Sequence, residues 1–406
     1  MKRAVHIALA TAVLALFMAS VQSCIARRNE FALYPTRSNV QLPGTIRVWL
    51  NSGEACKIQV AGGGYKLIAA GKTIFADSSP LPEVTASAAT DGIMIGRDFI
   101  GHRQAELVPE PGARLLVNNK PYRGLLRLIN NPSSGLMAVN VVDLDDYVAG
   151  VVCCEMPSLW KIPALMAQAV AARTYALYRA RTRASWSYDV CPTTGDQVYN
   201  GISGETSSGW EAVERTRGIV LLYDWKILPA YYHAVCGGHT ASRKTVFGEE
   251  EITPLAGREC RFCNPSMHGL LGPKMEKYFR WEVTVQQADL ASALALQGVN
   301  MPSIDAIVPV NIDAGGYAAA VDIRPKTGAP ARMPVEKFRL AVGFSKLISP
   351  AFNCTKKGNA FVFTGKGYGH GVGMCQWGAS GMARENYTSQ AILEYYYPGA
   401  QVTKVY

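Results

Sequence analysis

The sequence predicts an α+β fold with a helix-pair core, a β-rich N-terminal lobe and a β-rich C-terminal part. Short β-type runs broken by glycine and proline fill residues 45–130, and the apolar spacing becomes helical after about residue 139. β-type runs with glycine-rich turns then return from about residue 188. A length of 406 residues exceeds what one hydrophobic core usually organises, so two to three structural units are expected.

The composition excludes a disordered chain and indicates one class of partner. Hydrophobic residues make up 49% of the chain and charged residues 18%, against about 25% in a typical globular protein. The 41 basic and 31 acidic residues leave a net charge of +10, which favours an anionic partner. No nucleic-acid-binding motif and no block of five or more like charges is present, so nucleic acid is not the expected partner.

The N-terminus predicts export. Two basic residues precede an apolar run from Ile7 to Val21, and small residues lead up to Cys24, as in a signal peptide over residues 1–24. The tetrapeptide 21–24 resembles a bacterial lipobox, in which Cys24 would carry a lipid anchor to the membrane. Cleavage without lipid and a retained anchor helix stay open, although about 20 apolar residues are needed to span a membrane. We expect a protein of the periplasm or cell envelope, where cysteines can pair.

The N-terminal lobe is predicted from β-rich runs at residues 46–50, 57–60 and 65–68. The glycines at 62–64 and the Ser-Ser-Pro at 78–80 separate such runs. Because no catalytic constellation occurs there, this lobe is expected to be a scaffold.

The helix pair is predicted from the spacing of apolar residues. Leu144, Val148, Val151 and Glu155 follow one another at intervals of four, three and four, and Pro157 ends this helix. A second helix begins near Pro163, and its small-residue stripe over 165–176 would let another element pack closely. β-type runs follow at 219–223 and 361–363, a β-rich segment is expected at about 265–355, and residues 389–397 resemble a helix.

Glu155 is a carboxylate on the apolar stripe of the first helix, at its C-terminal end. Loss of hydration and the negative end of the helix dipole both raise the pKa of such a group. A carboxyl that is protonated near neutral pH could serve as the general acid of glycosidic cleavage. The alternative is an ordinary helix residue that faces water. No second carboxylate presents itself as a nucleophile, although hydrolysing glycosidases usually need two.

Long ordered motifs resemble those of one family. They are the stretch from Leu144 through Glu155-Met156-Pro157 to Ala176, the segment 367–379, and Tyr395–Gly399. With Tyr199–Gly201 and His233–Thr240, they resemble the stage II sporulation protein D family, which includes the LytB amidase enhancers, over residues 139–400.

The resemblance implies a catalytic region of the peptidoglycan lytic transglycosylase type, a lyase that cleaves glycan strands stripped of their stem peptides. The family's catalytic glutamate maps onto Glu155, and a functionally important arginine maps onto Arg173. Glu155 would protonate the glycosidic oxygen and then deprotonate the primary hydroxyl of muramic acid, which closes a 1,6-anhydro ring. Arg173 would pair with the lactyl carboxylate of muramic acid, or would instead tie the helix junction together.

A non-catalytic alternative stays open. As in amidase enhancers, the chain would bind glycan and stimulate a partner N-acetylmuramoyl-L-alanine amidase. The joint presence of Glu155 and Arg173 favours the enzyme.

Glycine occupies every second position from 365 to 373, in a segment without the Gly-Lys-Ser/Thr of a phosphate loop. One interpretation is a backbone that approaches flat sugar rings, with substrate-binding side chains from Tyr368, His370, Gln376 and Trp377. The other is a loop that packs against the second helix.

The chain has ten cysteines, and four residues have the spacing of a zinc site: Cys236, His239, Cys260 and Cys263. The resemblance adds that some family members bind zinc near residues 233–240. We therefore expect a structural zinc ion held by these four, with His233 as a substitute ligand, and no cofactor for catalysis. Disulfide pairing is the alternative.

Overall fold

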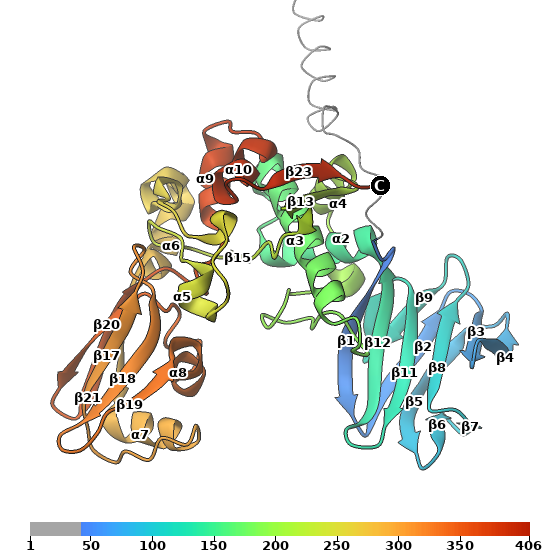
Figure 1. Ribbon diagram of the computed structural model, residues 1–406. Helices are drawn as coiled ribbons and strands as arrows, with labels where there is room; N and C mark the ends of the chain where they lie inside the picture. Colours follow the sequence, from blue (N-terminus) through green and yellow to red (C-terminus); the bar gives the residue numbers. More distant parts are fainter. Residues whose placement is uncertain (1–41) are drawn as a thin grey trace, which may run out of the picture.

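Two β lobes flank a helical centre in the computed structural model, which describes residues 42–406 (Figure 1). The predicted α+β class is confirmed. The predicted signal peptide and Cys24 lie outside the described residues. Within residues 42–406, no helix has both the length and the apolar character needed to cross a membrane.

The N-terminal lobe consists of two antiparallel six-stranded sheets that share one core. Alternate residues point into that core, as Ile46 and Val48 do on the first strand. In sheet order, the first sheet is β1 Thr45–Gly53, β12 Gly135–Asp143, β11 Leu125–Asn131, β8 Gln104–Pro109, β3 Tyr65–Ala69 and β4 Lys72–Asp77. The second is β10 Lys120–Tyr122, β9 Arg114–Val117, β2 Ala55–Ala61, β5 Leu81–Ala89, β6 Gly92–Ile95 and β7 Asp98–Ile100. The lobe therefore continues to Asp143, beyond the predicted boundary near residue 130.

The helical centre begins directly where the last strand of this lobe ends. The main helices are α2 Leu144–Glu155, α3 Ile162–Thr182, α4 Ser207–Arg215, α9 Gln376–Arg384 and α10 Ser389–Tyr396. Shorter helical segments are α5 Arg243–Phe247, α6 Gly272–Phe279, η1 Gly201–Gly204, η2 Thr253–Leu255, η3 Arg261–Cys263 and η4 Pro265–Leu271. Small sheets complete the centre: β13 Ile219–Tyr223 pairs with β14 Lys226–Ile227 and β23 Gln401–Lys404, and β15 Tyr232–His233 pairs with β22 Met374–Cys375.

The predicted helix pair is present as α2 and α3. Asp143 caps α2, because its carboxylate accepts hydrogen bonds from the backbone N–H groups of Asp145 and Asp146 at 2.9 and 3.4 Å. Met156 is extended and Pro157 follows it, so α2 ends at Glu155. Pro163 lies in the first turn of α3, where a missing N–H costs nothing.

The C-terminal lobe has two antiparallel three-stranded sheets and its own core. The sheets are β16 Arg280–Gln286, β21 Ala360–Lys366 and β20 Phe352–Lys357, and β17 Ile304–Ile312, β18 Ala318–Pro325 and β19 Ala331–Pro334. Helices α7 Gln287–Ala295 and α8 Val335–Val342 complete the lobe. Phe338, Phe361 and Phe363 anchor its core, which is separate from the core that joins the N-terminal lobe to the helical centre. Its strands and helices span residues 280–366, whereas the expected β-rich segment was 265–355; residues 265–279 form η4 and α6 instead.

Candidate active site and cysteine cluster

Glu155 lies at the C-terminal end of α2 and points into the protein. Its Oε1 accepts a 2.7 Å hydrogen bond from the backbone N–H of Val198, and its Oε2 accepts one from Gln376 Nε2 at 3.4 Å. The hydroxyl of Tyr232 also hydrogen-bonds to this carboxylate, and Tyr232 itself accepts a 2.9 Å bond from Gln197 Nε2. Four segments that are distant in the sequence therefore meet at one carboxyl group.

Burial raises the pKa of Glu155, and this effect outweighs the hydrogen bonds from Val198, Gln376 and Tyr232, which lower it. Within residues 42–406, no other carboxylate is bonded to Glu155 or to these three partners. The geometry therefore provides a carboxyl group with a raised pKa that shares none of its hydrogen bonds with a second acid. The sequence pointed to Glu155 and Gln376, but nothing in it indicated Val198 or Tyr232.

Arg173 does not lie beside Glu155. Its side chain is 0% exposed, and its Nε and Nη2 donate to Asp145 Oδ1 at 2.9 and 2.7 Å. The remaining donors approach Thr216 and the backbone carbonyls of Val213 and Ile219 at 3.3 to 3.5 Å. Because the guanidinium is enclosed by protein partners, it cannot pair with a substrate carboxylate in this structure. The geometry fits the alternative role, in which Arg173 ties α2, α3 and β13 together.

The glycine-rich segment is a packing element. Gly367, Gly369, Gly371 and Gly373 all have positive φ, and a Cβ on Gly371 would lie 2.2 Å from the Tyr317 ring. A Cβ on Gly373 would lie 2.0 Å from the carbonyl oxygen of Tyr231. The close approach is therefore to protein atoms around residues 231–236 and Tyr317. Of the two sequence interpretations, packing is observed, but against these segments and not against the second helix.

The side chains predicted to bind substrate separate into two groups. His370 accepts a 3.0 Å bond from the Val372 N–H and packs against His233, and burial lowers its pKa to about 3. It is therefore a neutral and partly buried side chain. Tyr368 is 42% exposed and stacks on Tyr278, and Trp377 is partly exposed beside Gln376.

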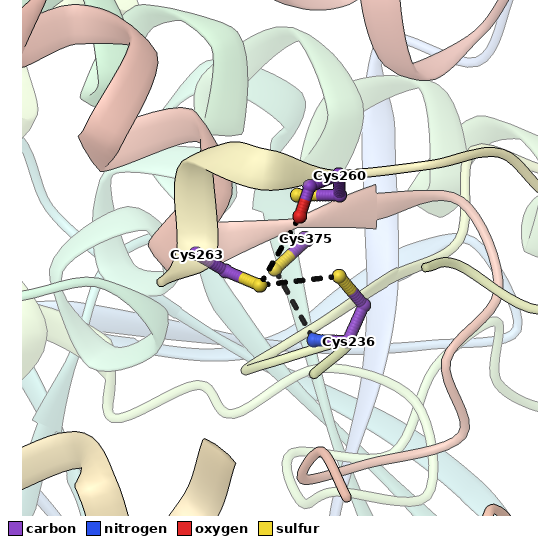
Figure 2. A group of neighbouring side chains, drawn as sticks. All are labelled: Cys236, Cys260, Cys263 and Cys375. Atoms are coloured by element: carbon purple, nitrogen blue, oxygen red, sulfur yellow. Dashed lines mark hydrogen bonds between the residues drawn. The ribbon is translucent and has the colours of Figure 1, made fainter. Parts of the chain in front are cut away.

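Four buried cysteines form a cluster that includes Cys375, the residue directly before Gln376. Figure 2 shows Cys236, Cys260, Cys263 and Cys375, whose sulfur atoms all lie within 4.8 Å of one another. Cys236 Sγ and Cys263 Sγ are 3.4 Å apart, and Cys375 Sγ accepts bonds from the backbone N–H groups of Cys236 and Gly378. No disulfide joins any of the cysteines between residues 42 and 406. Hydrogen bonds from the neighbouring thiols, that of Cys236 first, lower the pKa of Cys260.

The cluster corrects the predicted ligand set. His239 is not a member, since its Nδ1 lies 2.7 Å from the carbonyl oxygen of Thr240, and His233 pairs through Nδ1 with Val372 O. Cys375 takes the fourth position because parallel pairing of β15 with β22 carries it to the Cys236 loop. The sequence contained this cysteine but gave no spacing that linked it to the others.

Comparisons with known proteins agree with these motifs. The family model described as stage II sporulation protein matches residues 132–223, and a domain of unknown function (DUF8618) matches residues 269–373, within the C-terminal part. An uncharacterized protein of Brachyspira hyodysenteriae is 32% identical over 335 residues, which cover 79% of this chain and 84% of that protein. The stage II sporulation protein D of Bacillus subtilis is 27% identical over 285 residues, or 66% of this chain and 76% of its own. The amidase enhancer of the same species is 28% identical over 289 residues, or 63% of this chain and 40% of its own.

The match to the stage II sporulation protein model covers both helices of the helical centre that lead to and from this junction, α2 with Glu155 at its end and α3. The chain belongs to the stage II sporulation protein D and LytB amidase-enhancer family.

Proposed function

We propose that the chain is a peptidoglycan lytic transglycosylase that cleaves glycan strands stripped of stem peptides. The observation that carries the proposal is Glu155, a carboxyl group with a raised pKa, held by hydrogen bonds from Val198, Gln376 and Tyr232 and by none from a second carboxyl group. Hydrolysing glycosidases usually work with two carboxyl groups. An intramolecular reaction needs only one group that alternates between acid and base.

In the proposed reaction, protonated Glu155 gives its proton to the oxygen that leaves the anomeric carbon of muramic acid. The bond between that carbon and the leaving oxygen breaks. The primary hydroxyl of the same sugar attacks the anomeric carbon, and the Glu155 carboxylate takes its proton. The products are a 1,6-anhydromuramoyl end and a strand with a free hydroxyl, and the enzyme returns to its protonated form without consuming water.

The hydrogen bonds around Glu155 suit both halves of this cycle. The Val198 N–H and the Gln376 amide fix the two carboxyl oxygens in place, so the orientation survives the loss and return of the proton. The Tyr232 hydroxyl accepts a hydrogen bond from Gln197 Nε2, and Gln197 Oε1 in turn accepts one from the Tyr147 hydroxyl of α2.

The test is the product pattern of purified protein on stripped glycan strands. Wild-type protein is expected to release anhydromuramoyl products that mass spectrometry identifies, and Glu155→Gln is expected to abolish release while glycan binding survives. Glu282→Gln, an exposed change of the same type on β16, is the matched control. Continued turnover by Glu155→Gln would contradict the mechanism.

A non-catalytic role is the second candidate, because one relative is named an amidase enhancer. In that case wild-type protein would release no anhydromuramoyl product but would speed removal of stem peptides by an N-acetylmuramoyl-L-alanine amidase. Both roles imply a cell-wall protein that is exported to the periplasm or cell envelope, with or without a lipid on Cys24.

We also propose that the cysteine cluster holds one structural zinc ion. Four thiolates at about 2.3 Å from a tetrahedral zinc ion lie about 3.8 Å apart, which agrees with sulfur atoms gathered within 4.8 Å. Cys236, Cys260, Cys263 and Cys375 would be the ligands. Because four protein ligands close the coordination sphere, such an ion would supply folding energy and no catalytic chemistry.

A further inference from the structure

A pocket of about 740 Å³ opens beside the proposed active site. Pro157, two residues after Glu155, lies on one side of it, and Trp377, the neighbour of Gln376, lies on another. The short helices η4 and α6 supply the opposite wall through Leu271, Lys274 and Tyr278. Two of its lining residues are therefore near neighbours in sequence of Glu155 and of its partner Gln376.

Aromatic rings give the pocket apolar walls. Trp160 and Trp377 pack edge to face with their centroids 5.1 Å apart, and His268 supports Trp377 from behind at 4.9 Å. Tyr278 stacks on Tyr368 at 5.0 Å with an interplanar angle of 16°. Rings held rigidly by other rings suit the apolar faces of sugars, because little side-chain entropy is lost on contact.

The charges around the pocket all have one sign. Lys161, Lys274, Lys277 and Arg384 line it, and no aspartate or glutamate does. Lys161 Nζ is bonded only to neutral acceptors, the Arg384 carbonyl and Asn386 Oδ1. Over residues 42–406 none of these four cations forms an ion pair with a carboxylate. Four uncompensated cations near apolar walls form a site for an anionic ligand with apolar faces.

We infer that this pocket is the subsite that recognises the free lactyl carboxylate of a muramic acid unit next to the cleaved bond. The inference rests on the proposed function for its choice of ligand. The sequence suggested that Arg173 binds the lactyl carboxylate, but Arg173 is buried and paired with Asp145. The inference assigns this binding instead to the four cations of the pocket, Lys161, Lys274, Lys277 and Arg384. A stem peptide on the lactyl group would convert the carboxylate to a neutral amide and add bulk, so the subsite selects stripped strands.

An anionic membrane is the competing occupant, since Leu159 and Leu270 are 97% and 95% exposed near the same pocket. The glycan is favoured because the pocket adjoins Glu155 and because its walls are concave and aromatic.

The experiment measures binding by full-length Glu155→Gln protein, so that cleavage does not interfere. The ligands are stripped glycan strands and the same strands with their carboxylates amidated. Changing Lys274 and Lys277 to glutamine is expected to weaken binding to native strands roughly fivefold to tenfold, and to leave the already weaker binding to amidated strands unchanged. The matched control is Lys337→Gln with Lys346→Gln, which makes the same charge change at exposed lysines of the C-terminal lobe.

Two results would overturn the inference: equal losses on native and amidated strands, or no loss on either. A loss confined to binding of phosphatidylglycerol vesicles, shared by Leu159→Ser with Leu270→Ser, would assign the pocket to the membrane instead. The proposed function is judged separately, since carboxylate-dependent binding without any anhydromuramoyl product would leave the subsite standing and remove the lyase. Cleavage by wild-type protein together with unchanged binding by the lysine variants would support the lyase and remove the subsite.

Discussion

Glu155 experiences two opposing influences on its pKa. Three hydrogen-bond donors favour the ionised form, and removal from water favours the neutral form. Burial is the larger effect, so the protonated acid persists to a higher pH than an exposed glutamic acid would allow. Activity that begins with proton donation from Glu155 should accordingly fall as the pH rises through this raised pKa.

The same shift predicts an effect on stability. Because the folded-state pKa lies above the ordinary value of 4.5, the folded protein binds this proton more tightly than the unfolded chain does. Wild-type protein therefore loses stability as the pH rises from about 4.5 toward the raised pKa, whereas Glu155→Gln does not. The variant should melt at or above the wild-type temperature at pH 7, and the difference should shrink toward pH 4. A variant that is markedly less stable than Glu282→Gln at pH 7 would contradict this explanation.

The two ion pairs of Asp145 show how solvent exposure determines the contribution of an ion pair to the free energy of unfolding. Asp145 meets the fully buried Arg173 at 2.7 Å and the 72% exposed Arg217 at 3.5 Å. Loss of Arg173 leaves a carboxylate buried with little compensation, so Arg173→Met should lower the free energy of unfolding by about 3 to 5 kcal/mol. Arg217→Met removes a solvated contact and should cost at most about 1 kcal/mol.

Urea denaturation measures both changes. If Arg173→Met does not fold, Asp145→Asn supplies the second measurement, because it breaks the same ion pair by removing the opposite charge. Equal effects of the two arginine variants would show that Arg173 does not act through its burial.

At the scale of the elements, the cysteine cluster joins the Cys236 loop, the turn η3 and the strand β22, and β22 leads directly into Gln376. A metal ion there would fix the end of α9 that approaches Glu155. Cys375→Ser should abolish stoichiometric zinc in purified protein, as measured by elemental mass spectrometry, and should lower the melting temperature. Cys354→Ser, on β20 away from the cluster, should keep one zinc ion per chain. A zinc content near zero in wild-type protein, with oxidised cysteine pairs, would contradict the metal.

The elements that the sequence predicted well are those with local signals. Helix α2 begins at Leu144, the first residue of the predicted apolar stripe, and ends before Pro157, and β13 covers the predicted residues 219–223. The sequence did not predict that Cys375 joins the other cysteines or that Glu155 contacts Val198, Tyr232 and Gln376. These contacts are long-range, and long-range contacts leave no periodicity or spacing in the chain.

At the scale of the whole molecule, the described residues form two separate hydrophobic cores. One core is continuous from the N-terminal lobe into the helical centre and so fixes the end of α2 relative to a large scaffold. The C-terminal lobe packs around its own phenylalanines and lies on the opposite side of the helical centre (Figure 1). A substitution in the core of the C-terminal lobe is therefore expected to disturb the position of Glu155 less than a substitution in the core of the N-terminal lobe, because only the second core is shared with α2.

The last strand, β23, has a consequence for how the chain acquires its structure. It pairs with β13, and just beyond it the Tyr406 hydroxyl donates to Asp145 across a separation of 261 residues. Synthesis delivers α2, α3 and β13 long before it delivers β23 and Tyr406, so these two contacts can form only late. Contacts of such high sequence separation slow folding. The pairing of β23 with β13 is therefore expected to follow the local contacts within α2 and α3 when the protein refolds.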